Sequence, residues 1–255
     1  MSGALVIISV YLFLVGSCVA SFINVVIDRV PQGKSIVSDR SHCDACQHPI
    51  KAYDLIPVIS YILLRGKCRY CKQKIGLQSF IIECLGGLMM LFCFYRFGVS
   101  WMTPLSFLIF MILLAVTMID FDTMTIPNGL VISLFVLAVL HYFIWPELDL
   151  LTRVIGMVSV SGIMLAMTLM IPDSFGGGDI KLMAASGFLL GWANNLLAAF
   201  IGILIAGVYA IYLLMTKKNS RKDHIAFGPY LSVGIFMALL YGNDIIRLYL
   251  SLFHL

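Results

Sequence analysis

Charged residues are scarce in this 255-residue chain. They make up 12% of the sequence, and hydrophobic residues make up 61%. Soluble domains carry about 25% charged residues, so this chain has too little charge to cover a water-facing surface. The apolar runs also lack the alternating pattern, in segments of about ten residues, that is typical of outer-membrane barrels. The composition therefore predicts an all-α polytopic membrane protein.

Long apolar runs recur along the chain. A helix needs about 20 apolar residues to cross a bilayer, and the sequence offers about eight candidate transmembrane helices, of which the sixth is short. The predicted spans are residues 4–27, 79–97, 103–120, 128–145, 151–171, 180–193, 195–215 and 229–253.

No Lys or Arg precedes the first apolar run, and several follow it. This order argues against a cleaved signal peptide. It predicts an N-terminus outside and a cytoplasmic segment from residue 28 onward. With eight alternating spans, fourteen Lys and Arg residues fall on the cytoplasmic side and three (Arg96, Arg153 and Arg247) fall on or near the other. We therefore interpret the net charge of +4 as a signal of orientation within a membrane and its lipid, and not of nucleic-acid binding.

One segment, residues 28–78, is polar, and it holds two matched cysteine pairs, "CDAC" and "CRYC". A two-residue gap lets one tight turn present two sulfurs to the same ion, and four thiolates suit tetrahedral zinc. We expect Cys43, Cys46, Cys68 and Cys71 to hold a structural zinc ion in a zinc-ribbon-like cytoplasmic loop. The open alternatives are free or redox-active thiols, or replacement of one ligand by His42 or His48.

Two acidic residues lie where charge is costly. Asp120 stands at the inner end of the third predicted span, and Asp179 stands at the inner end before the sixth. Acids at membrane depth are candidate functional residues. Two facing carboxyl groups share a proton, so that one can accept a proton from water while the other polarises a carbonyl. The pair could instead bind ions in a transporter, or be two acids at helix ends facing water.

Three glycines, Gly176, Gly177 and Gly178, precede Asp179 in "SFGGGDIKL". Without side chains they would allow an extended peptide to approach the carboxylate closely. Glu83 stands at the entrance of the second span, either as a functional acid or as a snorkelling one. The sequence has no glycine-rich nucleotide fingerprint, so it gives no independent sign of where a cofactor binds.

Five motifs stand in order along the chain. Near the N-terminus is "SFINVVIDRVP", and the two cysteine pairs, "DFDTMTIPN", "GGGDIKL" and "AFGPYL" at residues 226–231 follow. Together they resemble the type IV prepilin leader peptidases, a family of GxGD membrane aspartic proteases. "DFDTMTIPN" is similar to the family's first catalytic motif, in which an aspartate precedes a proline by seven residues, and that spacing selects Asp120 over Asp122. "GGGDIKL" is similar to the second motif and selects Asp179, and "AFGPYL" is similar to a further element.

The resemblance implies a reaction and its partners. Members cleave the basic leader of prepilins or pseudopilins after a glycine, at the cytoplasmic face of the bacterial inner membrane. Many then methylate the new N-terminus with S-adenosylmethionine. We expect the same here, with Asp120 and Asp179 as the catalytic pair.

The chain is expected to divide into a first helix (1–27), a four-cysteine loop (28–78) and a transmembrane protease domain (79–255). Two other functions stay open beside the peptidase. One is an ion-coupled transporter that uses Asp120 and Asp179, and the other is a zinc-organised membrane scaffold.

Overall fold

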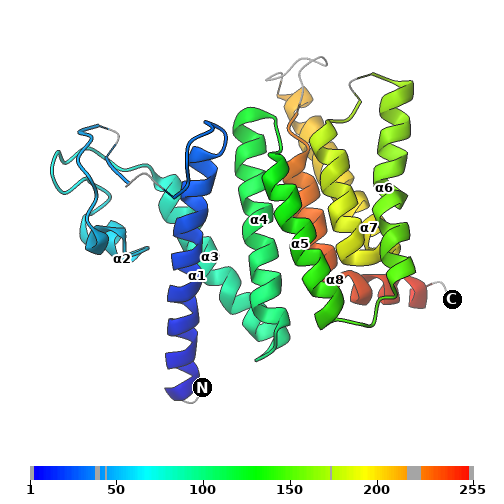
Figure 1. Ribbon diagram of the computed structural model, residues 1–255, viewed down its shortest axis with the longest axis horizontal. Helices are drawn as coiled ribbons and strands as arrows, with labels where there is room; N and C mark the ends of the chain where they lie inside the picture. Colours follow the sequence, from blue (N-terminus) through cyan, green and yellow to red (C-terminus); the bar gives the residue numbers. More distant parts are fainter. Residues whose placement is uncertain (1–2, 38–40, 44, 173, 217–224, 253–255) are drawn as a thin grey trace. The chain divides into compact units, whose positions relative to one another are not determined.

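The computed structural model describes residues 3–37, 41–43, 45–172, 174–216 and 225–252. All the named elements of its described part are helices (Figure 1). The elements are α1 (Gly3–Arg29), η1 (Ala52–Leu55), α2 (Ile59–Leu63), α3 (Leu77–Phe97), α4 (Met102–Thr123), α5 (Asn128–Ile144), α6 (Leu150–Met170), α7 (Gly177–Met215) and α8 (Gly228–Leu252).

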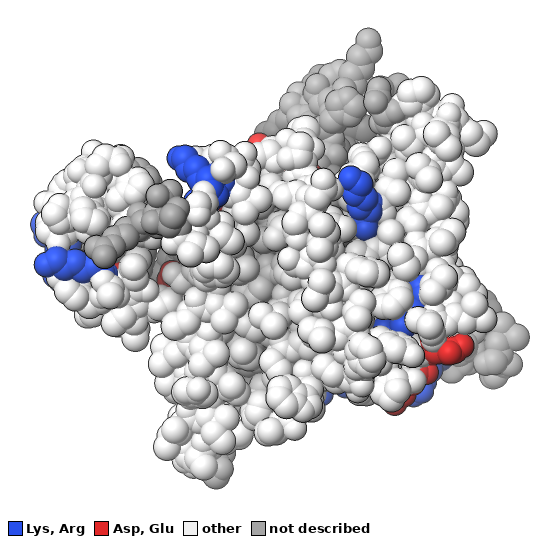
Figure 2. Space-filling view, viewed as in Figure 1, with Lys and Arg blue, Asp and Glu red and all other residues white. Residues whose placement is uncertain are grey.

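Six of these helices, α1, α3, α4, α6, α7 and α8, are long and apolar enough to cross a membrane, and α5 is a shorter apolar helix. On the face shown in Figure 2, uncharged side chains cover nearly the whole surface. The predicted all-α class with a four-cysteine loop between the first two spans is confirmed. The chain forms two compact units, Met1–Phe107 and Leu108–Leu255.

In the first unit, α1 packs against α3 through small residues. A Cβ atom on Gly16 would lie 2.6 Å from the Gly86 carbonyl oxygen, and one on Gly86 would clash with the Ala20 Cβ. Such contacts let helix backbones approach closely, which favours association in lipid. Asn24 also donates from its side-chain amide to the Ser79 carbonyl at 3.2 Å. The apolar sequence of these helices therefore carries a specific packing face.

In the second unit, α7 reverses direction at Gly191. Gly191 has φ 74° and ψ 172°, a conformation open almost only to glycine. Asn195 donates to the Met183 carbonyl at 3.2 Å, although a straight helix would hold these residues about 18 Å apart. Ser186 also donates to Asn195 at 2.8 Å. The chain therefore folds back into two helical segments, which correspond to the sixth and seventh predicted spans.

The segment 177–190 is about 21 Å long at 1.5 Å per residue, shorter than the hydrocarbon core of about 30 Å. Arg153 lies where this segment ends, with its side chain 0% exposed. Its guanidinium donates to the carbonyls of Phe188 and Leu189, each at 3.1 Å. It also donates to the Trp145 carbonyl beyond α5 at 3.1 Å. The sequence placed Arg153 on or near the side away from the cytoplasm, and the structure adds that its side chain is buried and caps two helix ends.

Candidate functional site

The two cysteine pairs form matching turns. The Cys43 N–H donates to the His48 carbonyl at 3.0 Å, and the Cys68 N–H donates to the Gln73 carbonyl at 2.8 Å. Each turn closes through a residue with positive φ, Gln47 at 56° and Lys72 at 60°. Two segments far apart in sequence thus fold in the same way. This repeated geometry is what places two sulfur atoms of each turn on one side.

The four sulfur atoms of Cys43, Cys46, Cys68 and Cys71 lie within 4.8 Å of one another. Tetrahedral zinc with Zn–S bonds of about 2.3 Å needs sulfur atoms about 3.8 Å apart. The Cys43 and Cys71 sulfur atoms are 3.8 Å apart. The cluster therefore fits zinc, and with four protein ligands the ion would have no open position for a substrate.

The pKa values of two of these thiols are shifted by their surroundings, and a bound cation would stabilise the ionised forms. N–H groups of Cys71 and Tyr70 lower the pKa of the Cys68 thiol to about 7. The Gln73 N–H lowers the pKa of Cys71, but desolvation and the neighbouring thiols outweigh it and raise that pKa to about 11. Four thiolates repel one another at this distance, and a divalent cation would remove the repulsion.

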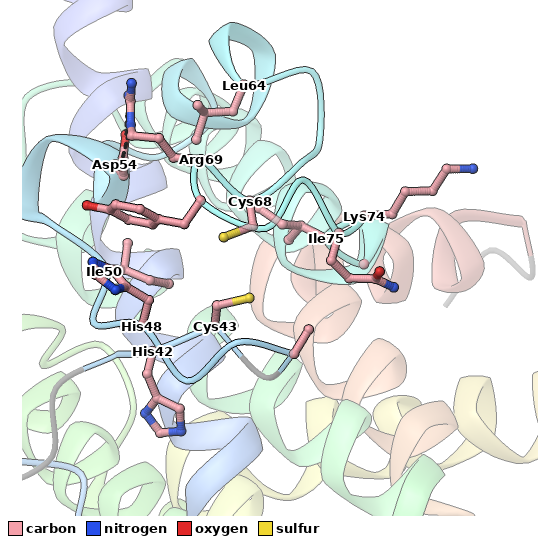
Figure 3. Close-up of a pocket in the computed structure, with 14 residues that line it drawn as sticks. His42, Cys43, His48, Ile50, Asp54, Leu64, Cys68, Arg69, Lys74 and Ile75 are labelled. Atoms are coloured by element: carbon pink, nitrogen blue, oxygen red, sulfur yellow. Dashed lines mark hydrogen bonds and ion pairs between the residues drawn. The ribbon is translucent and has the colours of Figure 1, made fainter.

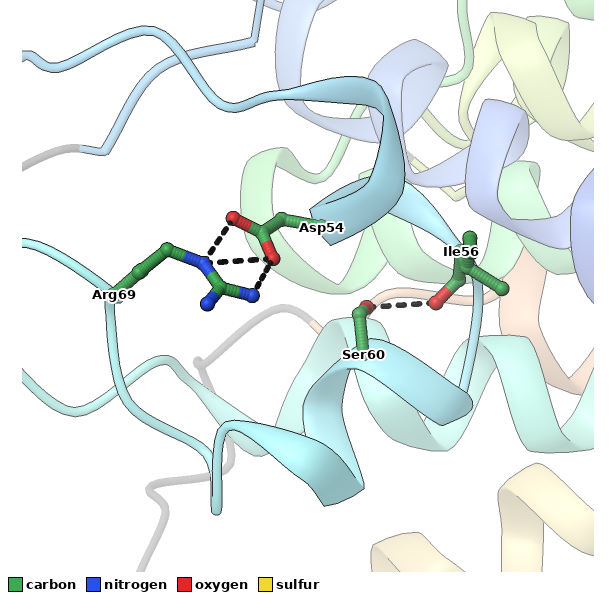
Figure 4. Close-up of polar contacts among 4 residues, drawn as sticks. All are labelled: Asp54, Ile56, Ser60 and Arg69. Carbon is green, nitrogen blue, oxygen red and sulfur yellow. Dashed lines mark hydrogen bonds and ion pairs between the residues drawn. The ribbon is translucent and has the colours of Figure 1, made fainter.

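Beside the cluster lies a cavity of about 470 Å³ (Figure 3). Leu64, Ile50 and Ile75 give it an apolar lining, and Lys74 lies at the same cavity. One wall is held by Arg69, whose guanidinium donates to both oxygens of Asp54 at 2.6–3.1 Å (Figure 4). These hydrogen bonds lower the pKa of the Asp54 carboxyl.

Glu83 lies at the start of α3, and its Oε2 accepts the Val58 N–H at 2.8 Å. Val58 has φ 62°, a strained conformation for a β-branched residue. The carboxylate thus anchors the turn before α2 to the first unit's helices. This anchoring role was not among the two alternatives that the sequence left open.

The second unit brings Asp120 and Asp179 together. Asp120, near the end of α4, is 5% exposed, and Asp179, in the first turn of α7, is 9% exposed. Ile126 links their surroundings, because it lies against Gly178, the neighbour of Asp179, and against Gly228, which contacts the Asp120 carboxyl group. Asp122 is exposed. Burial of this kind does not describe two acids at helix ends facing water.

Asp120 accepts a hydrogen bond from the Gly228 N–H, with 2.9 Å between Gly228 N and Asp120 Oδ2. Asp179 differs, because its buried Oδ1 has no hydrogen-bond partner in the described part of the chain. Buried polar atoms without a partner are uncommon and call for an explanation. A reactive water or a substrate carbonyl would supply the missing partner.

The loop after α4 fits between the other motifs. Met124, with φ 52°, ends α4 in a left-handed turn, and Pro127 keeps the helix from continuing. The loop presents Ile126, which would lie 2.9 Å from a Cβ atom on Gly178 and 3.1 Å from one on Gly228. Past this loop, Asn128 begins α5, and the ammonium group of Lys181 in α7 donates to its side-chain oxygen at 3.0 Å.

The three glycines have different surroundings. A Cβ atom on Gly176 would lie 2.9 Å from Asp179 Oδ2, and Gly178 adjoins Ile126, whereas nothing lies within 4 Å at Gly177. Space for a substrate is therefore open at Gly177. The sequence did not predict that Gly228 and Ile126 contact the surroundings of the two aspartates, although Gly228 lies in the "AFGPYL" motif.

The fold and this site define a helical membrane protein with a paired-carboxylate centre and a four-cysteine module. Residues 14–97 match the bacterial peptidase A24 N-terminal domain, and residues 107–211 match the type IV leader peptidase family.

Curated relatives are similar over nearly their whole length, and each is named prepilin leader peptidase/N-methyltransferase. The relative from Pseudomonas aeruginosa is 30% identical, covering 93% of this chain and 92% of its own. The relative from Neisseria gonorrhoeae is 31% identical, with 86% and 85% covered, and that from Bacillus subtilis is 29% identical, with 94% and 97% covered. No solved structure matches the chain significantly. The chain belongs to the type IV leader peptidase family and is a multi-pass inner-membrane protein.

Zinc content tests the four-cysteine site. We expect one zinc per chain, lost when Cys43 and Cys46 are both replaced by serine, because two thiolates cannot retain the ion. The loop should then become protease-sensitive. Elemental analysis and limited proteolysis measure both effects, with Cys18→Ser, on the exposed side of α1, as the control. Purified wild-type protein without metal would reject the site.

Gly178→Val tests the contact with Ile126. Valine has no room there, so we expect it to displace the loop or Asp179 and to abolish most leader cleavage without loss of zinc or expression. Gly129→Val is the matched control, because nothing lies within 4 Å of a Cβ atom at Gly129. Cleavage of a purified prepilin at the wild-type rate by Gly178→Val would show that this close contact is dispensable.

Proposed function

We propose that this protein is an aspartic endopeptidase that cleaves the leader of prepilins or pseudopilins after glycine and then methylates the new N-terminus. One observation carries the proposal. Asp120 and Asp179 are buried in one site, in a chain that belongs to a leader peptidase family. An ion-coupled transporter or a zinc-organised scaffold would not account for that family membership.

The two carboxyl groups suit hydrolysis of a peptide bond. One, ionised, takes a proton from water as the water oxygen attacks the scissile carbonyl carbon. The other, protonated, donates to the carbonyl oxygen and stabilises the tetrahedral intermediate. When the C–N bond breaks, the amine leaves with a proton from the pair, and the leader is released with a new carboxyl terminus. Asp179 Oδ1, which has no hydrogen-bond partner among the described residues, is available to one of the reacting oxygens.

The substrate must present an extended peptide bond to this pair. Backbone in lipid is normally helical, and its carbonyls are occupied, so the substrate must unwind at the cut. Glycine eases unwinding, because it is a poor helix former by about 1 kcal/mol relative to alanine. We place the cut at the cytoplasmic face, with the N-terminus outside, on the distribution of Lys and Arg. The basic leader would then stay in the cytoplasm.

For methylation, we place S-adenosylmethionine in the cavity of the four-cysteine module. Its volume of about 470 Å³ falls in the range of small-ligand sites, about 300–1,000 Å³. Apolar Ile50, Leu64 and Ile75 would receive the adenine ring. Lys74, whose side chain extends outward from the edge of the cavity in Figure 3, would turn inward to pair with the carboxylate. The bound donor supplies a methyl group to the new N-terminal amine.

Asp120→Asn and Asp179→Asn should each abolish cleavage while the protein stays folded in the membrane, since an amide can neither accept the water's proton nor share one. Asp122→Asn should retain most activity, because Asp122 is exposed. The measurement is cleavage of a purified prepilin in detergent. An inactive Asp122→Asn with an active Asp120→Asn would overturn the assignment. Cleavage should also resist metal chelators, and its rapid loss with zinc still bound would contradict an aspartic mechanism.

Lys74→Ala should weaken binding of S-adenosylmethionine by about tenfold, the effect of losing one charge-assisted hydrogen bond. Equilibrium dialysis with labelled donor measures this directly, apart from methylation. Lys67→Ala is the matched control, because Lys67 is exposed in the same module but does not line the cavity. If Lys74→Ala and Lys67→Ala bind S-adenosylmethionine with equal affinity, the proposed placement of the methyl donor in this cavity is wrong.

A further inference from the structure

We propose that the backbone N–H of Gly228 is a positioning group that orients Asp120 for catalysis. The inference rests on the proposed peptidase function and adds a third chain segment to it. Gly228 lies 108 positions after Asp120, at the start of α8, and its N–H donates to Asp120 Oδ2 at 2.9 Å. The donor and the acceptor are both buried.

The first turn of α8 leaves this N–H available. The first N–H groups of a helix have no partner within the helix. In α8, those of Tyr230 and Leu231 donate to the Phe227 carbonyl at 3.1 and 3.2 Å. Pro229 has no N–H to donate. The Gly228 N–H is therefore directed away from the helix, toward the carboxylate of α4.

Only glycine fits at this position. A Cβ atom on Gly228 would lie 2.7 Å from Asp120 Oδ2 and 3.1 Å from its Cγ. It would also lie 3.1 Å from Ile126 Cδ1. Any side chain would thus push directly on the carboxyl group and on the loop that follows it. A plain helix start would not need such close contact.

The start of α8 is held against the Asp179 motif as well. The rings of Phe227 and Phe175 are in contact, with centroids 5.9 Å apart. Phe175 precedes the glycines that lead to Asp179, and Ile126 adjoins both Gly178 and Gly228. The donor is therefore fixed relative to both carboxylates. Its role is to hold Asp120 Oδ2, so that the other oxygen is aimed at the substrate.

Two variants test this role in lipid nanodiscs. Gly228→Ala adds the clashing methyl group, and we expect kcat to fall by roughly a hundredfold with KM little changed. Glycolic acid at position 228, incorporated by nonsense suppression, replaces only the N–H by an ester oxygen. We expect this isosteric variant to lower kcat by about tenfold, the effect of one lost hydrogen bond. Gly129→Ala is the matched control and should keep the wild-type kcat.

Affinity for a statine-type transition-state analogue, measured by direct binding, should fall in parallel with kcat. Circular dichroism should show unchanged helix content in both variants. A glycolate variant with wild-type kcat and affinity would overturn the proposal, as would a rise in KM alone. A wild-type enzyme that does not cleave prepilin would instead reject the proposed function, so the two failures are distinguishable.

Discussion

Helix ends inside a membrane must have their carbonyl groups satisfied by the protein itself, and the second unit depends on one residue for this. Arg153 donates to carbonyls beyond α5 and at the end of the first segment of α7. A buried guanidinium is costly without such partners, and here it has several acceptors at two helix C-terminal ends, whose dipoles favour a cation. Arg153 satisfies the carbonyl groups that the chain reversal at Gly191 would leave without partners. It thereby stabilises the end of the short segment that carries Asp179.

That short segment explains how two acids far apart in sequence share one site. Asp120 lies in the last turn of a long helix, where backbone carbonyl groups are free, whereas Asp179 lies in the first turn of a segment of about four turns, where backbone N–H groups are free. The loop with Ile126 fills the space between them and contacts Gly178 and Gly228. Three chain segments therefore fix the carboxylates. Small residues in these motifs are required by contacts within the protein as well as by access for a substrate.

The sequence predicts those features that depend on local pattern. Apolar runs placed the helices, and the spacing of Cys43, Cys46, Cys68 and Cys71 predicted a cluster that the structure brings within 4.8 Å. Contacts over long separations left no such pattern. Arg153 could not be distinguished from a surface charge, and nothing near Gly228 indicated that its N–H reaches Asp120. Every residue except proline has a backbone N–H, so the residue type does not reveal which N–H is a functional donor. The only sign in the sequence is a glycine at a position where a side chain would not fit.

The two units stabilise negative charge by different means. In the four-cysteine module, neighbouring N–H groups favour the Cys68 thiolate, and a cation can neutralise the remaining repulsion. In the helical unit, by contrast, the proposed reaction needs no metal, because the two carboxyl groups would share a proton while the Gly228 N–H holds Asp120 Oδ2. This difference between the two carboxyl groups matters chemically, because in a symmetrical pair either group could bind the water or the substrate carbonyl. The Gly228 donor beside Asp120, and Asp179 Oδ1 without a hydrogen-bond partner in the residues that the structure describes, would give each carboxyl group a distinct face for the substrate.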